Sequence, residues 1–213
     1  MEVLEIKPVK NKDIMVNLIN LSNMKSDSKT IRDLIEFFKY ADIDFATIDV
    51  ENDNIKNFTQ SSLSRLLNHE KIPYFTVDIP EYAMGYIVEE ILEKEDQVNK
   101  LIEEYVSMKD KDTFKGQNLK SWISVLKDEI EEKKNILQMK LRPQWIVKKI
   151  LDIIKSKNKK EINVIHFAQD TIFIETMNLL KDLNVKIKNY EQEKEMLAFS
   201  IIINKEGVQQ WKC

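Results

Sequence analysis

Short apolar segments alternate with amphipathic helical segments in the first 80 residues of the chain. Residues 13–21, 44–50 and 72–79 are short, apolar and rich in β-branched residues, as expected for buried strands. Between them, residues 29–40 and 54–69 repeat apolar positions at the spacing of one helical face. This alternation of strand and helix predicts βαβ units on a parallel sheet.

A long, mostly helical stretch follows, from residue 81 to residue 157. One set of its apolar positions is spaced by seven residues, which is typical of a coiled coil. These positions are Met84, Ile91, Val98 and Tyr105. Residues 109–117 form a polar turn, Asn118 can cap the next helix, and Pro143 should break or kink that helix because it lacks an N–H group. The stretch therefore predicts a helical hairpin whose last part packs back on the sheet.

The remainder of the chain returns to the strand and helix pattern. Residues 161–168 predict a fourth strand, residues 171–183 a helix and residues 185–190 a fifth strand. Residues 196–203 are again strand-like and follow after only a short polar turn, so we expect an antiparallel edge strand there.

The expected fold is therefore α/β and Rossmann-like. Its sheet is mostly parallel, with about five strands and an antiparallel edge strand, and helices cover both faces. Residues 1–80 and 158–213 form one discontinuous domain, and residues 81–157 form a coiled-coil-like insertion between the third and fourth strands. Strand order stays open, because the parallel orders 3-2-1-4-5 and 2-1-3-4-5 share this succession of elements.

Composition removes several classes of function. The chain has only three glycines among 213 residues and no glycine-rich phosphate-binding motif, which argues against a dinucleotide or P-loop nucleotide site. Its single cysteine, Cys213, excludes an intramolecular disulfide and a cysteine zinc site. The formal net charge of −3 is not that of a polycation that binds nucleic acid through its overall charge.

The expected location is the cytoplasm. The first 13 residues alternate charged and apolar side chains and have no hydrophobic region of a signal peptide. No apolar run approaches the roughly 18 residues that a membrane-spanning helix needs, so no contact with a membrane is expected.

Acidic residues follow the ends of the second and third strands. If these strands are neighbours, Asp49 and Asp78 could share a hard cation such as Mg²⁺ or Mn²⁺, with His166 or Asp170 nearby. That arrangement would suit a metal-dependent hydrolase of phosphodiesters or nucleotides. Aspartate also caps turns and helices at strand ends very often, and a lone histidine in an apolar strand is more often buried than catalytic.

The hairpin supplies the other candidate site. Tyr105, Met108, Phe114 and Trp122 lie near its tip, where apolar side chains would be costly unless a partner covers them. The main hypothesis is therefore a non-enzymatic interaction or assembly module without a cofactor, which presents the hairpin to a protein partner or to a second copy. The lysine-rich run from Lys148 to Lys160 leaves nucleic-acid binding as a weaker alternative, since the aromatic residues that stack bases are absent there.

Overall fold

The computed structural model divides the chain into two compact units. It describes residues 6–21, 28–50, 55–183, 185–191, 197–204 and 207–210. The first unit, the α/β unit, comprises Met1–Asp78 and Arg142–Cys213, and the second, the hairpin unit, comprises Ile79–Leu141.

Five parallel strands form the centre of the α/β unit. They are β1 (Asp13–Asn20), β2 (Phe45–Ile48), β3 (Tyr74–Thr76), β4 (Glu161–Ala168) and β5 (Lys186–Glu191). They lie in the order β3-β2-β4-β1-β5, and each neighbouring pair is parallel. The predicted α/β, Rossmann-like fold is confirmed. The order differs from both parallel orders considered above, because β4 inserts between β1 and β2.

Two further strands continue the sheet beyond β5. They are β6 (Leu197–Asn204) and β7 (Gly207–Gln210). β6 pairs antiparallel with β5, and β7 pairs antiparallel with β6.

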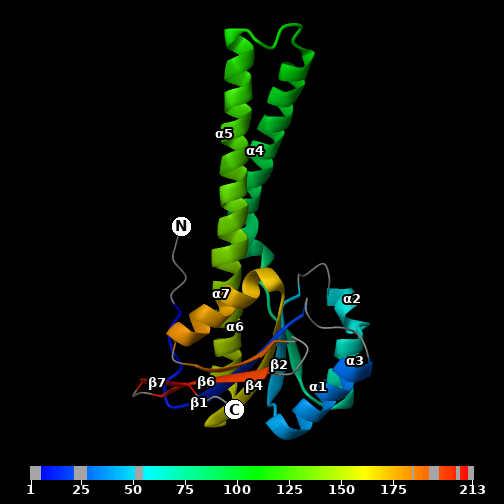
Figure 1. Cartoon of the computed structure of the whole chain (residues 1–213), viewed down its shortest axis with the longest axis vertical. Coiled ribbons are helices and arrows are strands. Elements are labelled where there is room, and N and C mark those ends of the chain that lie inside the picture. Colours follow the sequence, from blue (N-terminus) through cyan, green and yellow to red (C-terminus); the bar gives the residue numbers. More distant parts are fainter. Residues whose placement is uncertain are drawn as a thin grey trace. The chain divides into compact units, whose positions relative to one another are not determined.

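Helices cover both faces of this sheet (Figure 1). On one face, α1 (Ser28–Ala41), α2 (Ile55–Thr59) and α3 (Ser62–His69) pack with the apolar side chains of Ala46 and Ile48. On the other face, α6 (Arg142–Ser156) and α7 (Asp170–Asp182) pack with a second set that includes Val16 and Val164. The α/β unit thus has two apolar cores, one on each side of the strands.

Two elements of the α/β unit differ from their predicted extents. The single helix expected over residues 54–69 is divided into α2 and α3, because the Ser61 hydroxyl accepts a hydrogen bond from Ser64 N at 3.1 Å and caps a new helix. The third strand, expected over residues 72–79, has only three paired residues. Pro73 precedes them and has no N–H group to donate to the ladder.

The hairpin unit contains two long antiparallel helices that lie side by side (Figure 1). They are α4 (Glu81–Ser107) and α5 (Phe114–Ile136). α5 begins four residues before the predicted cap Asn118, because Thr113 is the cap: its hydroxyl accepts a hydrogen bond from Gly116 N at 3.2 Å. Within the described residues, each helix is too short or too polar to cross a lipid bilayer.

The chain passes from α5 to α6 without the expected break at Pro143. A π-helical turn, Leu137–Leu141, joins the two helices, and Pro143 is the second residue of α6. Proline is tolerated in the first turn of a helix, where N–H groups have no partner inside the helix. The departure from regular α-helix therefore lies in the π-turn just before Pro143, and not at the proline itself.

Candidate functional site

The carboxyl ends of β2 and β3 place two aspartates close together. Asp49 follows β2 directly and Asp78 follows β3 after one residue. The ladder continues past both strand ends, since Asp49 N donates to Phe167 O at 2.9 Å and Val77 N donates to Ile48 O at 2.8 Å. The backbone therefore holds both aspartates at one edge of the sheet.

Arg142, the first residue of α6, joins the two carboxylates. Its Nε donates to Asp78 Oδ1 at 2.8 Å, and its Nη2 donates to Asp49 Oδ1 at 3.1 Å and to Asp78 Oδ2 at 3.4 Å. The exposed fractions of these side chains are 5% for Arg142, 0% for Asp49 and 7% for Asp78. We call these three residues the Arg142 triad.

The Arg142 triad determines what the two aspartates can do. A planar guanidinium binds carboxylates through several donors at once, and such buried, charge-assisted hydrogen bonds are strong. A hard cation would have to compete with Arg142 for the same carboxylate oxygens. Among the described residues, no group of three His, Cys, Asp or Glu side chains is arranged to hold a metal ion. The Mg²⁺ or Mn²⁺ hypothesis for Asp49, Asp78, His166 and Asp170 stays a prediction.

His166 lies in the middle of the sheet and is fully buried. Its Nδ1 lies 3.2 Å from the Thr47 carbonyl oxygen and 3.0 Å from Thr47 Oγ1. In the tautomer that carries its proton on Nδ1, this nitrogen donates to the Thr47 carbonyl oxygen; in the other tautomer it accepts from the Thr47 hydroxyl. Nε2 has no hydrogen-bond partner among the described residues.

Burial keeps His166 neutral. Desolvation lowers the pKa of its imidazole to about 4, although the hydrogen bond to the Thr47 backbone opposes that change. A neutral, enclosed imidazole is a poor general base for a substrate that arrives from solvent. The side chain of Asp170, the first residue of α7, lies outside the described part of the structure.

An apolar seam closes the hairpin. Ile91 and Val98 of α4 pack against Leu126 and Ile130 of α5. Ion pairs connect the two helices beside this seam: Lys94 with Glu129, Lys133 with Glu90, Lys134 with Glu95 and Lys115 with Glu104. The hydrogen bond from Lys133, together with its positive charge, lowers the pKa of Glu90. The hairpin therefore has its own core and its own polar flanks.

Large apolar side chains remain exposed on α5 outside that seam. Phe114, Trp122 and Val125 expose 81%, 64% and 54% of their surfaces. They recur after eight and three residues, which places them on one side of the helix. We call Phe114, Trp122 and Val125 the α5 stripe. Of the residues predicted for interaction, Phe114 and Trp122 belong to it, whereas Tyr105 and Met108 are half-buried.

Several lysines between Lys148 and Lys160 have partners inside the chain. Lys148 Nζ lies 2.8 Å from Asp152 Oδ2, and Lys159 Nζ lies 2.7 Å from Asp44 Oδ1. The Lys157 ammonium lies over the Phe45 and Phe75 rings, 5.6 and 5.7 Å from their centroids. Nucleic-acid phosphates would have to compete with these intramolecular partners for the lysine ammonium groups. Nucleic-acid binding stays a prediction.

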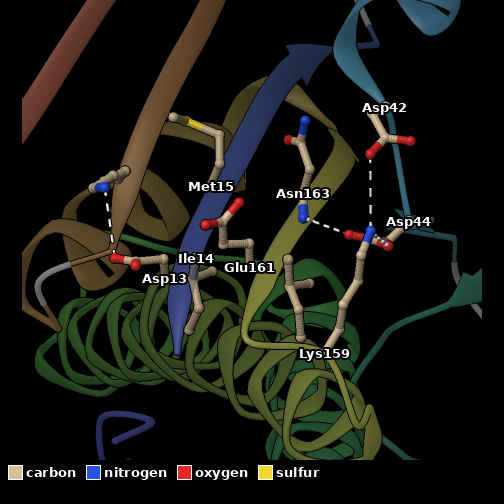
Figure 2. A pocket seen from close by; sticks show the side chains of 10 residues that line it. Asp13, Ile14, Met15, Asp42, Asp44, Lys159, Glu161 and Asn163 are labelled. Carbon is tan, nitrogen blue, oxygen red and sulfur yellow. Dashed lines mark hydrogen bonds and ion pairs between the residues drawn. The ribbon is translucent and has the colours of Figure 1, made fainter. Parts of the chain in front are cut away.

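A pocket of about 480 Å³ lies near the amino ends of β1 and β4, at the opposite end of the strands from Asp49 and Asp78 (Figure 2). Asp13, Asp42, Asp44 and Glu161 contribute its carboxylates. Asp44 accepts hydrogen bonds from Asn163 N at 2.8 Å and from Lys159, which also lies 3.8 Å from Asp42. Lys186 Nζ lies 3.6 Å from Asp13. The acidic side chains of this pocket are thus largely engaged with the chain's own donors.

Sequence reasoning did not find the role of Arg142 or Thr47. Neither residue was among the predicted site residues. One signal was present, since a lone arginine beside Pro143 occurs where the helix returns toward apolar strands. We compared the chain with protein-family models, curated proteins and solved structures, and none of them matches it.

Proposed function

We propose that this chain is a non-enzymatic protein-interaction module that binds a protein through the α4–α5 hairpin. The observation that carries the proposal is the α5 stripe, a set of exposed apolar side chains on the helix side that the hairpin seam does not use. Exposed aromatic residues grouped on one face are characteristic of protein-binding surfaces, since they bury much area at low cost in side-chain entropy.

The environments of the candidate catalytic residues support the same proposal. Arg142 holds Asp49 and Asp78 by hydrogen bonds in a buried position. His166 is neutral and enclosed by the sheet and its helices. These side chains are suited to holding α6 against the strands, whereas a reacting group must be reachable by its substrate.

The experiment compares one triple variant and one double control variant with the wild-type chain. The first is Phe114→Gln, Trp122→Gln and Val125→Gln, which removes the α5 stripe while keeping good helix formers. The matched control is Tyr40→Gln and Ile174→Gln, which removes exposed apolar side chains from the α/β unit. Association is measured by sedimentation of the purified protein and by affinity capture from an extract of the source cells.

We expect association, with another protein or with a second copy, to be lost in the α5 stripe variant and kept in the control. Circular dichroism should show equal helix content in all three proteins. The proposal fails if neither measurement detects association of the wild-type chain, or if the α5 stripe variant associates as strongly as the control.

A further inference from the structure

Two residues of the α5 stripe, Trp122 and Val125, belong to a longer repeat on the same helix. Residues at intervals of three, four, three, four and three follow one another along one side of α5. They are Lys115, Asn118, Trp122, Val125, Glu129 and Glu132. We call these six residues the outer seam. The spacing is that of the a and d positions of a heptad, so the outer seam has the geometry to pack against another helix.

The apolar centre of the outer seam, Trp122 and Val125, is separate from the seam that closes the hairpin, whereas Lys115 and Glu129 at its two ends also pair with Glu104 and Lys94 of α4. The closing seam uses Ile123, Leu126 and Ile130 on α5. Lys115, Trp122 and Val125 of the outer seam are exposed, and Glu129 exposes 45% of its side chain. A second helix could therefore pack on the outer seam while the hairpin stays closed.

Charge is distributed unevenly along the outer seam. A basic residue, Lys115, stands at its amino end, two acidic residues, Glu129 and Glu132, stand at its carboxyl end, and Trp122 and Val125 occupy the centre. Antiparallel pairing with an identical seam places Trp122 against Val125, Asn118 against Glu129 and Lys115 against Glu132, each contact occurring twice. An amide or an ammonium then donates to a carboxylate on both sides of the apolar centre.

Parallel pairing of the same residues has the opposite consequence. It places Lys115 against Lys115, Glu129 against Glu129 and Glu132 against Glu132, which are repulsive contacts. The charge pattern is thus complementary to itself only in the antiparallel orientation. A twofold axis between Trp122 and Val125 produces that orientation, and twofold interfaces are self-complementary in this way.

We propose that a second copy of this chain docks on the outer seam, with the two α5 helices antiparallel about a twofold axis between Trp122 and Val125. This inference rests on the proposed function, and it names the partner and the register. The two tryptophans and two valines form the apolar centre of the contact, and Asn118 and the charged residues select the register.

The test uses two charge reversals, Lys115→Glu and Glu132→Lys. In either variant alone, both Lys115–Glu132 contacts between the copies become repulsive, so we expect dimerisation to weaken about tenfold. In an equimolar mixture of the two variants, each mixed dimer regains two opposite-charge contacts. The mixed dimer should therefore form with an affinity within about twofold of the wild-type value. The Lys115→Glu, Glu132→Lys double variant should also regain wild-type dimerisation.

Matched controls carry the same charge changes on the other side of α5. They are Lys120→Glu and Glu131→Lys, at exposed positions outside the outer seam. We expect each control to dimerise as the wild-type chain does. Because Lys115 also pairs with Glu104 within the hairpin, circular dichroism must show that Lys115→Glu keeps its helix content. Rescue by Glu132→Lys on another copy cannot arise from that internal pair.

The measurement is sedimentation velocity of a fluorescently labelled copy titrated with unlabelled protein up to about 1 mM. Weakening by each reversal and recovery in the mixture support the proposal. Equal effects at the outer seam and at the control positions, or no recovery in the mixture, overturn it. If the wild-type chain is monomeric and its α5 stripe still binds another protein, the proposal that the partner is a second copy fails, and the proposed function remains. A monomeric chain in which the α5 stripe variant changes no association refutes both.

Discussion

At the scale of single residues, the Arg142 triad concentrates charge in a buried place. Removing one partner of a buried ion pair leaves the other desolvated and uncompensated, at a cost of about 3–5 kcal/mol. Arg142→Met should therefore lower the free energy of unfolding by about that amount, since Asp49 and Asp78 would both lose its donors. Urea unfolding of the wild type and the variant measures the difference.

The matched control for that prediction is Arg65→Met. Arg65 is exposed on α3, so its replacement should change the free energy of unfolding by no more than about 0.5 kcal/mol. Adding Asp49→Asn and Asp78→Asn to Arg142→Met removes the uncompensated charges and should recover part of the loss. If Arg142→Met and Arg65→Met cost the same, the Arg142 triad does not stabilise this edge of the sheet.

His166 predicts a dependence of stability on pH. Its pKa is about 4 in the folded chain, against an ordinary value of 6.5, so the unfolded chain binds a proton over a pH range in which the folded chain does not. His166 makes its full contribution to the free energy of unfolding above pH 6.5. As the pH falls from 6.5 toward 4, the free energy of unfolding decreases by up to about 3 kcal/mol because the unfolded chain binds a proton at this residue. The measurement is urea unfolding between pH 7 and pH 4.

Replacement of His166 by a group that does not titrate should flatten this dependence. We expect His166→Gln to be less stable than the wild type at pH 7, but to lose less stability on acidification. His69→Gln is the control, because His69 is the other histidine and its side chain is 79% exposed. An identical pH dependence in the wild type and in His166→Gln would contradict the assigned burial.

At the scale of elements, the sequence pattern predicted which helices and strands exist better than it predicted their first and last residues. The strand at residues 161–168 has its predicted limits, because a mostly apolar segment is bounded there by the polar residues Lys160 and Gln169. The start of α5 was misplaced by five residues, since the cap is Thr113 and not Asn118. Thr113 and Asn118 are both residue types that cap helices. Thr113 is the cap because the turn closes tightly at Gly116, and the spacing of apolar residues does not predict that closure.

Gly116 and Gly85 provide a matched pair of glycines in the hairpin. A Cβ atom at Gly116 would lie 2.2 Å from the Lys111 backbone oxygen, so Gly116→Ala must displace the turn, at a cost of about 1–3 kcal/mol. A Cβ atom at Gly85 in α4 meets nothing within 4 Å, so Gly85→Ala should stabilise its helix by about 1 kcal/mol.

Hydrogen exchange of hairpin peptides distinguishes these two substitutions. Gly116→Ala should speed the exchange of amides in the turn and the first part of α5, and Gly85→Ala should slow exchange in the first part of α4. Slower exchange near the turn in Gly116→Ala would show that the close approach of Lys111 does not constrain this position.

At the scale of the whole molecule, long-range pairing was the part that sequence could not predict. The position of β4 between β1 and β2 follows from crossover paths, which hydrophobic periodicity does not encode. Arg142 is separated by 64 positions from Asp78 and by 93 positions from Asp49, so no local pattern connects them. The strand-end positions of Asp49 and Asp78 could be predicted, whereas the side chain that binds both could not.

The division into two units predicts that the hairpin can be shortened without unfolding the sheet. The two cores of the α/β unit contain no residue between 97 and 135, and the hairpin unit has its own apolar cluster. Replacing residues 97–135 by a short turn should therefore leave the amides of β1 and β4 as protected from hydrogen exchange as in the wild type. The reference for a damaged sheet is Ile165→Ala, which should reduce that protection because Ile165 is fully buried in β4. A shortened chain whose β1 and β4 amides exchange as fast as those of Ile165→Ala would mean that the α/β unit depends on the hairpin for its stability.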